Sequence, residues 1–173
     1  MTRDRSSRSR LVTVLGVGVV GVVLTCLALA PVSASLEESG VRVEVTYTGA
    51  ERGEVVAVFR PLDAGFHLYG PGLPRDGIDG AGRPTLLEVP AGSAWSSTGA
   101  VHAEPATTLQ SLPSFDRPFP IFPDGPVTLR LPVERTASAA HDAELIVSVT
   151  YMACSSRGLC LAPVIAHEIR VPT

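Results

Sequence analysis

The stretch Val41-Arg-Val-Glu-Val-Thr-Tyr-Thr48 places an apolar side chain at every second position, with charged or polar side chains between them. Successive side chains of a β-strand point to opposite faces, so this alternation predicts a strand with one buried face and one solvated face. The stretch consists mainly of β-branched and aromatic residues, which strands favour. We expect residues 41–48 to form the first strand of the folded domain.

Six further stretches of the same kind follow, short, rich in β-branched residues and separated by Gly, Pro or Asp: residues 54–60, 66–69, 84–89, 127–134, 143–151 and 164–171. After the first 34 residues no sustained apolar repeat at helical spacing occurs, and prolines interrupt most windows. Seven or eight short strands with long connections predict two packed antiparallel sheets rather than a parallel α/β sheet. The expected fold is all-β, an immunoglobulin-like β-sandwich.

The start of the chain differs in character from the rest. Four arginines lie within residues 1–10, and an uncharged apolar run covers residues 11–30. This is the charge order of an export signal, and the small residues at 32–34 fit a cleavage site after Ala34. We therefore expect a signal peptide over residues 1–34 and the folded domain over residues 35–173. An apolar run of about 20 residues also spans a bilayer, so a retained membrane anchor is the alternative.

These features predict an exported protein of the periplasm or of the outer face of the cell envelope. The arginines are not adjacent, so the twin-arginine signal is absent and the general secretory route is expected. Thr25 precedes Cys26 where a lipoprotein signal needs a small residue, so lipidation is not expected. The formal net charge is −3 and becomes more negative without the Arg-rich start. No basic footprint for nucleic acid is left.

Cys154 and Cys160 lie between two strand-like stretches, in the segment Tyr151-Met-Ala-Cys-Ser-Ser-Arg-Gly-Leu-Cys160. The short interval between them predicts a hairpin-like loop with the cysteines on neighbouring strands, at Cα separations that a disulfide can bridge. Cleavage after Ala34 would remove Cys26 and leave these two as the only thiols in an oxidising compartment. We expect an intramolecular disulfide.

This disulfide can be a structural staple or a redox-active couple. A disulfide ring this short lowers the entropy of the unfolded chain only slightly, which stabilises the fold by about 2 kcal/mol. Immunoglobulin domains place their structural disulfides across the core. Arg157 and Gly158 lie inside the ring, where a positive charge and an unencumbered backbone favour an approaching thiolate. These features favour thiol–disulfide exchange. A non-catalytic immunoglobulin-like binding module with a structural disulfide is the alternative.

The same segment resembles the amino-terminal periplasmic domain of the DsbD family of thiol:disulfide interchange proteins. That family has a Tyr, two residues, a cysteine pair with this spacing and a Pro soon after, and the matching residues are Tyr151, Cys154, Cys160 and Pro163. Residues 63–69, which end in Tyr69, are similar to the family's Gly-aromatic-x-Leu-Tyr strand. Residues 127–133 are similar to its strand before the cysteines. The resemblance covers most of the chain after Leu36.

The resemblance implies a cysteine couple that exchanges disulfides with envelope partners, either thioredoxin-like proteins or a membrane electron carrier, with Cys160 as the attacked sulfur. Its expected modulators are Arg157, Tyr151, Tyr69 and Pro163. The resemblance also implies an aromatic cap loop over the sulfurs, to be sought within residues 102–122 at Phe115 and Phe119. From the residues alone, these aromatics either form a lid or tuck into the end of the sandwich.

Other chemistries have weaker signals. The histidines lack ligand spacing and are interpreted as strand or surface residues: His67, His102, His141 and His167. The cysteines, Met152 and one histidine would suit Cu(I), so a copper-handling domain is a further alternative. Residues 76–82 lack the acidic ligands of a calcium loop. No nucleophile elbow, P-loop or dinucleotide fingerprint occurs, and no cofactor or resident metal is expected.

Overall fold

The computed structural model describes residues 33–173, and these residues are all-β and contain no helix. The expected export signal or anchor, with its apolar run and Cys26, lies almost entirely in residues 1–32, outside the described residues. Within residues 33–173 no helix is long and apolar enough to cross a membrane.

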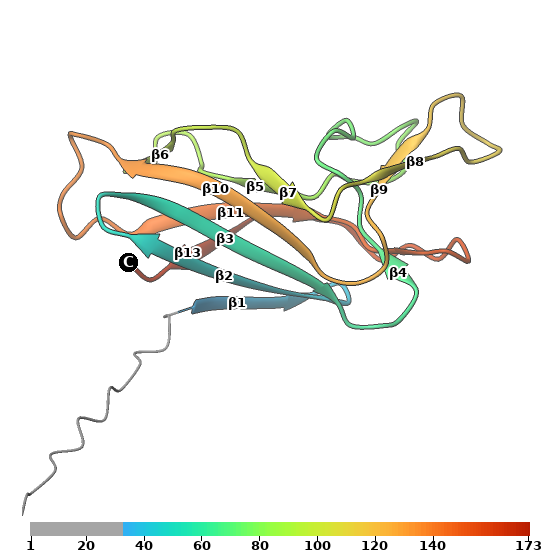
Figure 1. Ribbon diagram of the computed structural model, residues 1–173, viewed down its shortest axis with the longest axis horizontal. Helices are drawn as coiled ribbons and strands as arrows, with labels where there is room; N and C mark the ends of the chain where they lie inside the picture. Colours follow the sequence, from blue (N-terminus) through green and yellow to red (C-terminus); the bar gives the residue numbers. More distant parts are fainter. Residues whose placement is uncertain (1–32) are drawn as a thin grey trace, which may run out of the picture.

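One layer of the molecule is a six-stranded antiparallel sheet with the order β1-β2-β3-β10-β6, in which β7 also pairs with β10. Its strands are β1 (Ser33–Glu38), β2 (Val41–Gly49), β3 (Arg52–Pro61), β6 (Trp95–Ser97), β7 (His102–Glu104) and β10 (Val127–Arg135). The long strands β2, β3 and β10 run along the length of the molecule (Figure 1). They provide one wall of the core.

The second layer is a three-stranded antiparallel sheet with the order β13-β11-β5. Its strands are β5 (Leu86–Glu88), β11 (Leu145–Tyr151) and β13 (Val164–Val171). The main hydrophobic cluster draws fully buried side chains from both sheets, among them Val43, Phe59 and Leu129 from the larger and Val147 and Val149 from the smaller. The two sheets therefore form an immunoglobulin-like sandwich, and the predicted fold class is confirmed.

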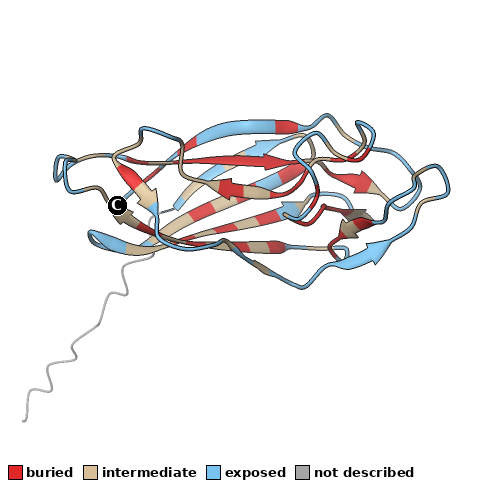
Figure 2. Ribbon diagram, turned by 90° about the horizontal axis from the view of Figure 1, so that it is seen from above, coloured by how far each residue is buried: buried red, intermediate tan, exposed pale blue. Residues whose placement is uncertain are grey.

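Two short two-stranded sheets lie at one end of the sandwich. β4 (Phe66–His67) pairs with β12 (Cys154–Ser155), and β8 (Thr108–Gln110) pairs with β9 (Phe119–Ile121). Both pairs are at the end away from the C-terminus (Figure 1). Figure 2 shows buried residues concentrated in the strands of the body and exposed connections at both ends. This end is where the sequence places the cysteines.

The alternating sequence pattern accounts for the walls of the sandwich. In β2 the side chains of Val41, Val43 and Val45 are fully buried, whereas Arg42 and Glu44 face outward. β10 shows the same alternation from Val127 to Glu134. Because one face of each strand meets the opposite sheet, a one-residue shift in register would turn every buried side chain to solvent. The hydrophobic pattern therefore fixes the register of these strands.

All seven predicted strands are present, as β2, β3, β4, β5, β10, β11 and β13, although β4 and β5 are shorter than expected. The expectation that residues 41–48 form the first strand was wrong, because Ser33–Glu38 pairs along its whole length with β2. Ser39 and Gly40 both have positive φ and make the tight turn between them, which suits adjacent antiparallel strands. β1 begins at Ser33, so the expected domain boundary after Ala34 falls inside this strand.

We predict that Leu129→Ala lowers the free energy of unfolding by about 2 to 5 kcal/mol, because Leu129 is fully buried in the central strand β10. The neighbouring Arg130 points to the other face, where it makes a half-exposed ion pair with Glu54 at 3.2 Å. Arg130→Ala is the matched control and should cost less than about 1 kcal/mol. Urea unfolding followed by Trp95 fluorescence measures both, and equal losses would contradict the assigned faces of β10.

Candidate functional site

Cys154 and Cys160 form a disulfide with an S–S distance of 2.07 Å and a Cα–Cα distance of 4.0 Å. Cys154 begins β12, and the two cysteines face one another as an antiparallel bridge across the hairpin. The predicted intramolecular disulfide and its hairpin-like loop are therefore confirmed.

Main-chain hydrogen bonds hold the hairpin closed on both sides of the sulfurs. The Ser155 N–H donates to the Leu159 carbonyl at 2.7 Å, and the Leu161 N–H donates to the Ala153 carbonyl at 2.9 Å. Gly158 turns the chain with a φ of 87°, a backbone conformation that glycine adopts without steric cost. These bonds do not involve the sulfurs, so the hairpin has support that is independent of the disulfide.

The two cysteines differ in exposure. Cys154 is 2% exposed and belongs to a second hydrophobic cluster at this end of the sandwich, together with Tyr69 and Phe119. Cys160 is exposed to solvent. A nucleophile in solution can therefore approach Cys160, whereas the core covers Cys154.

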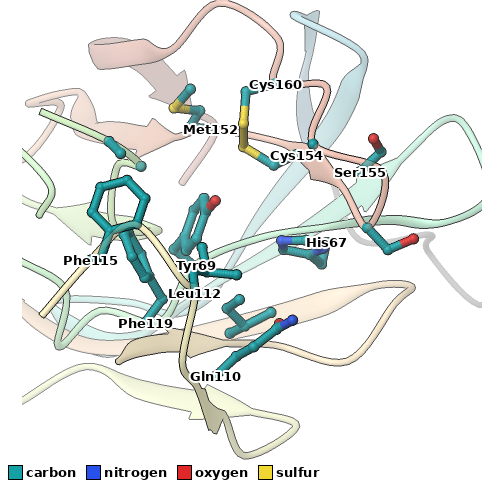
Figure 3. Close-up of a pocket in the computed structure, with 15 residues that line it drawn as sticks. His67, Tyr69, Gln110, Leu112, Phe115, Phe119, Met152, Cys154, Ser155 and Cys160 are labelled. Atoms are coloured by element: carbon teal, nitrogen blue, oxygen red, sulfur yellow. A yellow bond between two sulfur atoms is a disulfide. The ribbon is translucent and has the colours of Figure 1, made fainter. Parts of the chain in front are cut away.

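The disulfide borders a pocket of about 310 Å³ with a mainly apolar lining. Its aromatic wall consists of Tyr69, Phe115 and Phe119, with ring centroids 5.7 Å apart for Tyr69 and Phe119 and 5.0 Å apart for Phe115 and Phe119. Figure 3 shows these rings across the pocket from the disulfide, with Met152 beside the sulfurs. Of the two arrangements left open for these aromatics, Phe119 tucks into the core at 1% exposure, and Phe115 is half-buried above it.

Residues 102–122, in which the cap loop was expected, contain three short strands, β7, β8 and β9. β9 carries Phe119 directly, and the turn between β8 and β9 carries Phe115. β8 and β9 therefore form a hairpin in which β9 belongs to the second hydrophobic cluster and β8 is exposed. Sequence reasoning missed these strands because each has only three residues among several prolines.

The structure brings some expected modulators to the pocket and places others elsewhere. Tyr69 lines the pocket, and burial raises the pKa of its phenol. Tyr151 lies in the main core, where its hydroxyl donates to the Glu38 carbonyl at 3.0 Å and burial raises its pKa. Arg157 is exposed and lines a neighbouring hollow with Ala64 and Gly65. Pro163 is exposed ahead of β13 and is not part of the pocket lining.

His67 is a pocket residue that sequence reasoning interpreted only as a strand or surface position. It lies directly opposite Cys154 in the β4–β12 ladder, is 8% exposed and lines the same pocket. Burial lowers the pKa of its imidazole, and the negative charge of Asp124 acts weakly in the other direction. The period-two spacing of His67 and Tyr69 could have revealed that they share a face. Its pairing with Cys154 is a tertiary feature that no local pattern reports.

The remaining histidines lie outside the pocket, and the nearest carboxylate to each is a glutamate: His102, His141 and His167. Among the residues that the structure describes, no three or more His, Cys, Asp or Glu side chains gather as a metal-ligand set. Met152 and His67 are the side chains near the cysteines that the copper-handling alternative would require.

Comparisons with known proteins concern the fold. No family model and no curated protein matches the chain. One similar solved structure is the reduced DsbD N-terminal domain of Neisseria meningitidis, with 18% identity and a TM-score of 0.49, covering 79% of this chain and 87% of that one. Another is the GAE domain of GGA2p from Saccharomyces cerevisiae, with 13% identity and a TM-score of 0.42, covering 83% of this chain and 99% of that one.

The fold and the site together define an immunoglobulin-like β-sandwich with a disulfide hairpin at one end. The first of the two solved structures comes from the family that the cysteine motif resembles. At these TM-scores neither likeness decides what the domain does.

We predict that the reduced domain stays folded and loses about 2 kcal/mol of stability, because the ring is short and main-chain bonds hold the hairpin. Trp95 is the chain's single tryptophan and is 2% exposed, so its fluorescence follows unfolding in urea with and without a reductant. Iodoacetamide-treated oxidised protein is the control for effects of the reagents. Loss of the cooperative transition on reduction would identify the disulfide as a structural staple.

Proposed function

We propose that the domain carries out extracytoplasmic thiol–disulfide exchange through Cys154 and Cys160, as a relay of the protein-disulfide oxidoreductase type. The observation that carries this proposal is the asymmetry of the disulfide, with Cys160 exposed and Cys154 buried in the second hydrophobic cluster. A structural staple gains from burial of both sulfurs, whereas exchange needs one sulfur within reach of a partner. The resemblance of the cysteine motif to the DsbD family supports the same function.

The exchange begins with a partner thiolate that attacks the exposed sulfur of Cys160. A bond forms between the partner's sulfur and Cys160, the Cys154–Cys160 bond breaks, and Cys154 leaves with the electron pair as a thiolate. A second partner thiolate then attacks the partner's own sulfur in the mixed disulfide and releases Cys160. Two electrons pass to the domain, the partner becomes a disulfide, and the reverse sequence of steps oxidises the domain.

The local structure suits a couple that must work in both redox forms. The hairpin bonds of Ser155 and Leu161 involve neither sulfur, so the cysteines keep their positions after the disulfide opens. The rings of Phe115 and Phe119 belong to the mainly apolar lining of the pocket that the couple borders. The exposed Cys160 is the cysteine that a partner can approach from outside.

The proposed partners are envelope proteins with their own thiol–disulfide couples, either thioredoxin-like proteins or a membrane electron carrier. The proposed location is the periplasm or the outer face of the cell envelope, with residues 1–34 as signal peptide or membrane anchor and residues 35–173 as the exchange domain. The basic and then apolar start of the chain supports this location.

The second candidate is a non-catalytic binding module in which the disulfide is structural. The observation in its favour is the 2% exposure of Cys154 within a hydrophobic cluster, since buried disulfide sulfurs are common in structural bridges. The two functions differ in whether the disulfide exchanges with other proteins, which trapping experiments measure.

We predict that Cys154→Ser accumulates a mixed disulfide with an envelope protein, because Cys160 still forms a bond to the partner while the thiol that would resolve it is missing. The complex should appear as a larger band on non-reducing gels and disappear with dithiothreitol. Cys160→Ser should trap much less, because its remaining thiol is the buried one. The variant with both cysteines replaced by Ser is the control for non-covalent capture.

The relay is excluded if neither single variant traps a protein while the wild-type domain in the same cells is oxidised. In that case the binding module is the function that the structure supports.

A further inference from the structure

We propose that His67 is the charge partner of Cys154 during exchange, taking up a proton as Cys154 becomes a thiolate. This inference rests on the proposed function and names the side chain that assists its first step. It assigns a role that neither the cysteine motif nor the family resemblance supplies.

The β4–β12 ladder places the two side chains together. His67 and Cys154 are direct partners in this antiparallel pair, and directly opposed residues project to the same face with Cβ atoms about 4.5 to 5.5 Å apart. Both residues are buried and line the same pocket. In Figure 3 the imidazole lies on the side of the pocket that holds Cys154 and Ser155, away from Phe115 and Phe119.

The neighbouring hydrogen bonds hold His67 in this position from both sides. The Ser156 N–H donates to the Gly65 carbonyl just before β4, and the Phe122 N–H donates to the Leu68 carbonyl just after it. The His67 ring also packs edge to face against Tyr69, with ring centroids 5.6 Å apart. The imidazole therefore has a defined place next to the buried sulfur.

A thiolate at Cys154 needs a compensating charge. Cys154 is 2% exposed, and an ionised group without a partner is costly in such surroundings. Among the described residues that line the pocket there is no Arg, Lys, Asp or Glu, and the uncharged polar ones are Tyr69, Gln110, Ser155 and Ser156. His67 is the lining residue that can become a cation, whereas Arg157 lines the neighbouring hollow.

The protonation state of His67 follows the redox step. The titratable groups facing it are Cys154 on β12, Tyr69 just beyond β4 and Asp124 ahead of β10. In the oxidised domain, burial lowers the pKa of the imidazole and favours its neutral form. A thiolate at Cys154 adds a negative charge beside it and favours the imidazolium, which takes its proton from solvent. The pair then consists of an imidazolium and a thiolate, so no net charge is buried.

The kinetic test compares His67→Gln with the wild type in reduction by dithiothreitol between pH 5 and pH 9. The imidazolium forms more readily at low pH, and a better-stabilised leaving thiolate departs faster. The wild type should therefore react about threefold faster than the variant at pH 5, because a one-unit change in thiol pKa acts on the exchange rate with a Brønsted slope of about one half, and the ratio should fall toward one at pH 9. His102→Gln is the matched control, because His102 is exposed on β7 outside the pocket.

A second measurement needs no change at His67. In the Cys160→Ser variant the remaining thiol of Cys154 titrates alone, and thiolate absorbance together with the imidazole proton resonances follows both groups. We expect a Cys154 thiol pKa below the ordinary value and a histidine resonance that shifts in the same pH range. Independent titrations of the two groups, or a rate ratio that does not vary with pH, would overturn the role of His67.

The two experiments separate this inference from the proposed function. A wild-type disulfide that dithiothreitol reduces only after unfolding would contradict exchange itself, while the titration of Cys154 and His67 in the Cys160→Ser variant would still decide whether they are coupled. Fast reduction of wild type and His67→Gln alike would keep the exchange function and remove His67 from it.

Discussion

The short ladder between β4 and β12 is the constraint on which the site depends. It holds Cys154 against the second hydrophobic cluster, opposite His67, while the hairpin carries Cys160 out to solvent. Two paired residues on each strand are enough, because the segment around β4 is hydrogen-bonded on its other side to residues 120–122 as well. The fold itself therefore buries Cys154 and exposes Cys160, and no mobile element is needed for this difference.

The domain has two separate hydrophobic clusters, one between the sheets and one beside the disulfide. The main cluster lies between the two sheets and contains the fully buried side chains of β2, β3, β10 and β11. The second cluster is smaller, lies at one end and contains Cys154 together with aromatic residues. Because the disulfide borders the second cluster and not the main one, we expect its opening to change contacts at the end of the sandwich and to leave the inter-sheet packing in place.

The sequence predicted the sandwich because its long strands have unbroken alternation, as in Val41–Gly49 and Val127–Arg135. It did not predict β1, in which small and acidic residues replace the β-branched ones, nor the three-residue strands among the prolines. The disulfide was predicted from the short interval between the two cysteines and from the oxidising compartment expected for an exported protein. The unequal burial of the two cysteines and the position of His67 depend on the pairing of Cys154 with His67, which lies 87 positions earlier in the chain (154 − 67). No local sequence pattern contains this pairing. Tyr151 is close to the cysteines in the sequence but not in the site. Its hydroxyl donates to the carbonyl of Glu38, the last residue of β1 in the other sheet.

The equilibrium reduction potential of the Cys154–Cys160 couple distinguishes a redox-active disulfide from a structural one. The purified domain would be equilibrated in glutathione and dithiothreitol buffers of known potential, and its free thiols counted by the mass added on alkylation. Structural disulfides of secreted proteins lie below about −300 mV, whereas exchanging couples have higher potentials. A redox-active couple gives a single two-electron transition well above that value, with the domain folded at both ends of the titration. A transition below about −300 mV, or one that coincides with unfolding, would contradict the proposed exchange.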